Sequence, residues 1–148
     1  MISPEKLRRY PYFAGVSGGS LKAIAVVADE ESVPNGTTMF SEGDPAKKLY
    51  IIVKGQVDIQ YTLGSGELRT VDTLVDGDLL VWSALVDPHK CTTVGTTAQD
   101  TQLIAIDAAK LNDLCDADPL LGYRLMSQVS KLLAHRLEGA RIQLATID

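Results

Sequence analysis

Short apolar runs alternate with tight turn sequences through the middle of the chain, from residue 31 to residue 107. The runs are rich in Val, Ile, Thr and Tyr, and NG, EGD, KG, GSG and DGD segments separate them. Two of them, Leu49–Val53 and Gln56–Tyr61, have the length and composition of strands and are broken at Gly55. Asn35-Gly36 is typical of a hairpin turn with positive φ. The pattern therefore predicts about eight short strands wound into an antiparallel β-roll.

Helical patterns flank this region on both sides. Pro4–Tyr10 favours a short helix, and Ser17 is a candidate N-cap for a second one. The apolar residues of that second helix recur at helical spacing and are Leu21, Ile24, Ala25 and Ala28. After the strands, Asp107 is a candidate N-cap for a helix over 108–116, and Asp118-Pro119 supplies a cap and a first-turn proline to another. The sequence thus predicts a helical cap before the roll and helices after it.

The final helix carries two apolar stripes. One alternates spacings of four and three residues and comprises Met126, Leu133, Leu137, Ala140, Leu144 and Ile147, with Ser130 in the remaining position. The other comprises Leu121, Leu125, Val129 and Leu132 and can cover the β-roll. The first stripe can cover the roll too, or it can meet its own copy, and both contacts can hold at once. The heptad spacing favours a homodimer formed through this helix.

Length and composition fit this arrangement within one domain. The chain has 148 residues, and 45% of them are apolar, which is enough for one hydrophobic core. We therefore expect an α+β fold, an antiparallel double-stranded β-roll of jelly-roll type with N-terminal helices and a long C-terminal helix. Its parts are a helical cap over 1–30, the roll over 31–107 and the C-terminal helices over 108–148.

The net charge and the cysteines indicate which partners the protein can bind and which compartment it occupies. The net charge of −5 opposes binding to nucleic acid or to an anionic membrane surface. The first ten residues are charged where a secretory signal would be apolar, and no apolar run is long enough to span a bilayer. Cys91 and Cys115 lie far apart without CxxC spacing, which favours reduced thiols. These features predict a cytoplasmic protein with no direct nucleic-acid or membrane partner.

The glycines at the turns, with the apolar residues between them, resemble a known family. Between residues 33 and 59 the sequence VPNGTTMFSEGDPAKKLYIIVKGQVDI is similar to the cyclic nucleotide-binding domains of bacterial Crp/Fnr-type regulators, kinase regulatory subunits and gated channels. The resemblance covers about residues 7–144. It implies a regulatory sensor domain in which a short cassette, here 77–94, holds the cyclic phosphate and the ribose. No helix-turn-helix pattern follows, so we expect a stand-alone sensor rather than a complete transcription factor.

The cassette departs from the family pattern at three points. The Gly-Glu pair that the resemblance implies is replaced by Val81-Trp82, and the phosphate-binding arginine is replaced by Lys90. Indole is a hydrogen-bond donor only, so Trp82 cannot accept a bond from a ribose hydroxyl. Lysine keeps the positive charge but loses the planar, two-pronged geometry of arginine. We therefore expect ordinary cAMP to bind weakly or not at all.

The candidate ligand-binding residues all lie in this cassette and are Gly77, Val81, Trp82, Ser83, Ala84, Lys90, Cys91 and Thr92. In a rebuilt pocket, Lys90 and the amides near Ser83 and Ala84 would attract an anionic group, and Trp82 would stack on a ring. The simpler interpretation makes Trp82 a pocket-filling residue and Lys90 a solvated surface charge. No resident cofactor is expected, and the ligand would be a cyclic nucleotide or another small anion.

The sequence lacks the residue clusters that a metal enzyme or a serine hydrolase requires. The chain has two histidines, His89 and His135, which are too few for a cupin-like metal site, and no GxSxG motif surrounds Ser83. We therefore expect a non-enzymatic sensor that couples pocket occupancy to the orientation of the last helix and, through it, to an effector protein of unknown identity. The alternative is an interaction or dimerisation scaffold that has lost nucleotide binding.

Overall fold

The computed structural model describes residues 1–147 of the chain. Three helical segments come first: α1 (Pro4–Arg8), the 3₁₀ helix η1 (Pro11–Phe13) and α2 (Gly18–Val26). Eight strands follow within the described residues: β1 (Ala28–Val33), β2 (Thr38–Phe40), β3 (Lys48–Lys54), β4 (Gln56–Thr62), β5 (Leu68–Val75), β6 (Leu79–Leu80), β7 (Val94–Thr97) and β8 (Thr101–Asp107). The 3₁₀ helix η2 (Trp82–Leu85) lies between β6 and β7, and α3 (Ala108–Ala117) and α4 (Pro119–Ala145) complete the chain.

The strands form two antiparallel sheets of four strands each. One sheet has the order β1-β8-β3-β6, and the other has the order β2-β7-β4-β5. In β3, Leu49 and Ile51 pack in the larger cluster, which the N-terminal helices and α4 share, whereas Ile52 packs between the sheets. All three side chains are fully buried. This strand is therefore apolar on both faces, and the predicted α+β roll with flanking helices is confirmed.

One local prediction at a turn is wrong. Gly36 has the expected positive φ of 81°, but the strands on either side of Asn35-Gly36 do not form a hairpin. β1 pairs with β8 in one sheet, and β2 pairs with β7 in the other. The Gly36 amide donates to the carbonyl of Thr97 at 2.9 Å, on the strand next to β2. The turn therefore carries the chain from one sheet to the other.

The predicted caps of the three longer helices are confirmed. The Ser17 hydroxyl accepts a hydrogen bond from the amide of Ser20, and the Asp107 carboxylate accepts one from that of Lys110. Asp118 caps α4, and its pKa is lowered chiefly because the Ser20 hydroxyl donates to its carboxylate, and secondarily because the Leu121 amide does. The same aspartate thus ties the start of α4 to α2.

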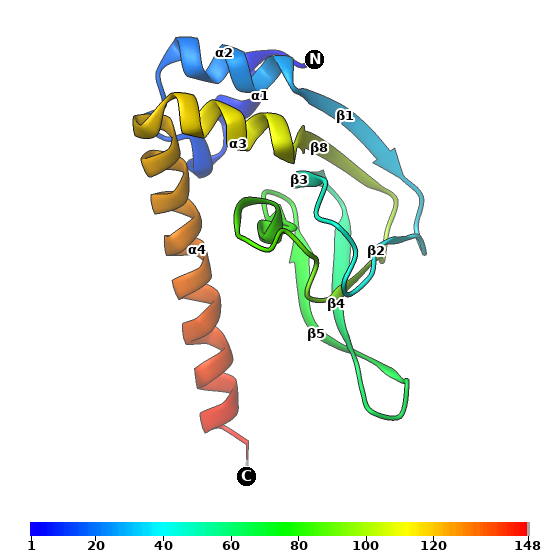
Figure 1. Ribbon diagram of the computed structural model, residues 1–148. Coiled ribbons are helices and arrows are strands. Elements are labelled where there is room, and N and C mark those ends of the chain that lie inside the picture. The colour runs from blue at the N-terminus through cyan, green and yellow to red at the C-terminus, as the bar shows by residue number, and fades with distance from the viewer. Residues whose placement is uncertain (148) are drawn as a thin grey trace.

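Helix α4 is docked at its beginning and free of the roll toward its end. Figure 1 shows it descending beside the roll from the layer formed by α1, α2 and α3, with the two chain termini at opposite ends of the molecule. Leu121, Leu125 and Val129 are buried, whereas Leu137 and Leu144 are 52% and 70% exposed. Within the described residues no helix has both the length and the apolar character needed to cross a membrane.

Candidate functional site

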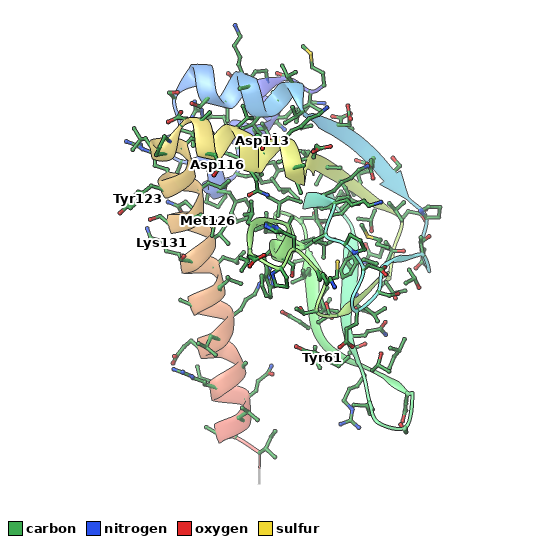
Figure 2. The ribbon with its side chains drawn as sticks, in the orientation of Figure 1. Tyr61, Asp113, Asp116, Tyr123, Met126 and Lys131 are labelled. Atoms are coloured by element: carbon green, nitrogen blue, oxygen red, sulfur yellow. The ribbon has the colours of Figure 1, made fainter. Side chains whose placement is uncertain are left out.

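A cavity of about 470 Å³ lies between the roll and the second half of α4. Its walls come from both sheets, from the cassette and from the helix. The lining residues are Phe40, Ile59, Tyr61, Val71, Asp72, Leu74, Leu80, Val81, Trp82, Ser83, Cys91, Thr92, Thr93, Leu133, Arg136, Leu137 and Ala140. Figure 2 shows Tyr61 on the β4–β5 ribbon, while Tyr123 and Lys131 lie on the side of α4 away from the roll. The cavity is largely apolar, with a small number of polar groups.

The helical wall of the cavity is one stripe of α4. Leu133, Arg136, Leu137 and Ala140 follow the spacing i, i+3, i+4 and i+7, which places them on one face of the helix. The buried residues of the same helix stop at Val129. The first half of α4 is therefore held by the core, and the second half forms a wall of the cavity.

The cassette begins with a backbone conformation that valine rarely adopts. Val81 has φ of 65° and ψ of 54°, in the left-handed region, directly between β6 and η2. A β-branched residue is a clear outlier there, because its Cβ crowds the neighbouring carbonyl. Glycine at this position would relieve the backbone strain and would also let backbone amides approach a ligand closely.

The left-handed conformation of Val81 reverses the usual order of stability of an alanine and a glycine substitution. Val81→Gly is expected to be more stable than Val81→Ala by about 1 kcal/mol, because alanine keeps the left-handed cost and glycine removes it. At Val75, in strand β5 and with ordinary φ, the alanine variant should be the more stable of the pair. Chemical denaturation of the four variants checks both orders. A Val81→Ala protein more stable than Val81→Gly would contradict the strain.

Trp82 opens η2 and contributes its half-buried side chain to the cavity wall. It is the single tryptophan of the chain, so its emission reports on this cavity alone. Both a stacking surface and a pocket-filling residue are compatible with this placement. The indole therefore has the position that a ligand contact requires.

Five of the eight candidate residues from the sequence line the cavity: Val81, Trp82, Ser83, Cys91 and Thr92. Gly77 does not, because it forms a turn with φ of 87°, and its carbonyl accepts a hydrogen bond from the Tyr12 hydroxyl at 2.9 Å. Ala84 lies within η2 and is fully buried in the core instead of lining the cavity. Its carbonyl accepts from the side-chain amide of Asn112 at 2.9 Å and lies 3.0 Å from Nδ1 of His89, so it anchors the cassette to α3.

Lys90 also lies outside the lining, and its side chain is exposed. Its segment is bonded to the 43–46 loop on both sides: the Ala46 amide donates to the carbonyl of His89 at 2.9 Å, and the Cys91 amide donates to that of Asp44 at 2.8 Å. Successive side chains of an extended segment point to opposite faces. With Cys91 turned into the cavity, Lys90 faces solvent.

The charged groups of the cavity are two residues that the sequence analysis missed. Arg136 comes from α4, and its Nη2 donates to the carbonyl of Leu79 at 3.0 Å. Asp72 comes from β5, and its Oδ1 accepts from the Thr73 amide at 2.9 Å. The one available signal for Arg136 was its place between Leu133 and Leu137 in the apolar stripe. For Asp72 the local sequence carries no signal, because only the pairing of β5 brings it to the site.

The remaining chemistry of the described residues is modest. Burial raises the pKa of the Cys91 thiol, and Asp44 adds to the rise, so the thiolate is disfavoured at neutral pH. Burial likewise raises the pKa of Cys115. Across residues 1–147 no three His, Cys, Asp or Glu side chains gather in a way that could hold a metal ion. The arrangement is suited to binding a small molecule.

Comparisons with known proteins likewise indicate a domain of a ligand-binding family. The family model described as "Cyclic nucleotide-binding domain" matches residues 30–118. The CRP-like cAMP-activated global transcriptional regulator of Mycobacterium tuberculosis is 27% identical over 143 residues, which are 97% of this chain and 62% of that protein. The chain thus spans less than two thirds of this curated relative.

Solved structures agree with the fold. A Geobacter metallireducens protein described as a cyclic nucleotide-binding protein is 31% identical with a TM-score of 0.84, and the match covers 93% of this chain and 99% of that one. The Thermus thermophilus Catabolite Activator Protein is 26% identical with a TM-score of 0.71, and the match covers 91% and 62%.

Proposed function

The chain belongs to the cyclic nucleotide-binding domain family, and from this premise we propose that it is a non-enzymatic sensor whose ligand occupies the cavity between the roll and α4. One observation carries the proposal: the cavity is walled on one side by the sheets and the cassette and on the other by α4. Its volume of about 470 Å³ is within the range of small-molecule sites, roughly 300–1,000 Å³. A ligand there touches both parts of the domain.

The lining defines the class of ligand. Trp82 and Tyr61 offer aromatic faces to a ring, Arg136 offers a positive charge, and Asp72 offers a hydrogen-bond acceptor. A cyclic nucleotide or another small anionic ring compound has the matching groups. Ordinary cAMP is expected to bind weakly, because Trp82 stands at the carboxylate position that the family pattern implies and Lys90 faces away from the cavity.

The signal is a change in how α4 is docked. The first half of the helix is anchored by Leu121, Leu125 and Val129, and the second half lacks buried residues of its own. A ligand that contacts the Leu133–Ala140 stripe stabilises one position of that half, provided that it binds this position more tightly than others. The helix would pass the change to a second copy of the chain, bound through its exposed apolar residues, or to an effector protein.

Titration of the purified protein with cAMP, cGMP and cyclic dinucleotides tests the proposal. Binding of at least one at micromolar strength should change Trp82 emission and raise the melting temperature. Trp82→Leu should then weaken binding by about tenfold, since an aromatic pair contributes roughly 0.5–1.5 kcal/mol beyond its area. Absence of heat and of a melting shift with every compound would favour the alternative, a scaffold that has lost nucleotide binding.

A further inference from the structure

We propose that Arg136, on α4, binds the anionic group of the ligand, in place of the cassette position occupied by Lys90. The inference rests on the proposed function and deepens it, because it names the residue that selects a charged ligand. It follows from where the two cations lie. Arg136 lines the cavity and is half-buried, whereas Lys90 is exposed and outside the lining.

Arg136 has donors to spare for a ligand. A guanidinium carries five N–H groups, and the structure uses one of the two terminal nitrogens, Nη2, for the Leu79 carbonyl. Among residues 1–147 the ion pairs involve the N-terminus, Lys6 and Lys48, so no carboxylate neutralises Arg136. A half-buried, unpaired guanidinium favours a planar anion that accepts two parallel hydrogen bonds.

Two acidic groups on this side of the roll, Asp78 and Asp72, each accept a hydrogen bond from a backbone amide. Asp78, one residue before Leu79, accepts from the Val75 amide at 2.8 Å. Asp72 lines the cavity from β5 and accepts from the Thr73 amide at 2.9 Å. Since Asp72 is the one carboxylate of the lining, it repels an anion from that wall and attracts a hydrogen-bond donor. The ligand is therefore oriented with its anion toward α4.

This orientation makes charge a requirement for the signal. An anion on Arg136 ties the ligand directly to the half of α4 that lacks buried anchors, and the existing bond from Nη2 to the Leu79 carbonyl holds the guanidinium against β6. A neutral ring of the same shape would fill the cavity without that tie. Arg136 thus determines the charge specificity of the site.

Two probes with one ring system separate charge from shape. Anilinonaphthalene sulfonate is an aromatic anion, and phenylnaphthylamine is the same framework without the sulfonate. Energy transfer from Trp82, the single tryptophan, weights the readout toward probe bound near the cavity. The variants are Arg136→Gln, which keeps a donor for the Leu79 carbonyl, and Lys90→Gln as the matched control. Thermal melting verifies that each variant is folded.

Arg136→Gln should weaken the sulfonate probe by about tenfold or more and leave the neutral probe within about twofold, because a charge-assisted hydrogen bond is lost. Lys90→Gln should change neither. Equal weakening of both probes by Arg136→Gln, or loss of the sulfonate probe in Lys90→Gln, would overturn the role of Arg136 while leaving the cavity a ligand site. If neither probe binds the unmodified protein, the cavity does not accept an aromatic anion of this kind and the inference fails, whereas the proposed function is decided separately by the titration with cyclic nucleotides.

Discussion

Gly55→Ala is expected to lower the free energy of unfolding by about 3 kcal/mol or more. Gly55 has φ of 138°, which L side chains rarely adopt, and an added Cβ would lie 2.8 Å from the backbone Cα of Thr101 and closer still to its hydroxyl. Backbone strain of this kind costs roughly 1–3 kcal/mol, and overpacking adds a similar amount. The neighbour cannot retreat, because Thr101 lies in β8, which pairs with both β1 and β3.

Two other glycines separate the cost of backbone strain from the cost of the clash with Thr101. Gly36 has φ of 81° with open space around it, and Gly64 has open space and no positive φ. Gly36→Ala should therefore cost about 1 kcal/mol, and Gly64→Ala should be close to neutral. Urea denaturation of the three variants gives the comparison. A Gly55→Ala protein as stable as Gly36→Ala would show that Thr101 yields to the added methyl group.

The sequence predicted the parts of the fold that depend on neighbouring residues. Glycine turns are set by local backbone conformation, and helix caps are set by hydrogen bonds within one helical turn. All three predicted caps, Ser17, Asp107 and Asp118, are present. The hairpin at Asn35-Gly36 was wrong because a turn sequence fixes local dihedral angles and not the sheet that each strand joins. That choice is made by β7 and β8, which are distant in sequence.

The candidate site likewise has one part that neighbouring residues determine and another that only the tertiary fold determines. Val81, Trp82 and Ser83, named from the sequence as ligand contacts, share one wall of the cavity because they are consecutive and lie within one recognisable segment, and their role in binding stays a prediction. The opposite walls come from β4, β5 and α4, and only the tertiary fold brings Asp72 and Arg136 to the same cavity. The cation predicted for the ligand was Lys90, whose extended backbone turns it outward. The direction of a side chain in such a segment follows from its pairing with the 43–46 loop and is not encoded by residue type.

The end of α4 has more apolar surface than one chain can cover. Leu137, Ile142 and Leu144 are each more than half exposed, as is Ile147 just after the helix, and this part of the helix has no buried residue. A helix in a protein is stabilised mainly by packing its apolar face, and isolated helical segments are only marginally stable in water. A second copy of the same helix, meeting it along the seam of Leu137, Ala140 and Leu144, is the partner that the heptad spacing favours.

Leu144→Glu is therefore expected to convert the proposed homodimer into monomers, halving the mass measured by light scattering. Burying a carboxylate against its own copy in the seam is costly, and the two copies repel each other. Leu144 separates assembly from ligand binding, because it lies outside the cavity lining, whereas Leu137 belongs to both the seam and the lining.

Ile142→Glu is the matched control for this variant. It introduces the same charge near the same helix end, on a side chain that is 55% exposed and about 200° around the helix from Leu144. The control should leave the mass unchanged, since that face is turned away from the seam. Monomer formation in Ile142→Glu alone would place the dimer contact on the other face of α4. A mass unaffected by either change would mean that the exposed end of the helix is not a contact between copies.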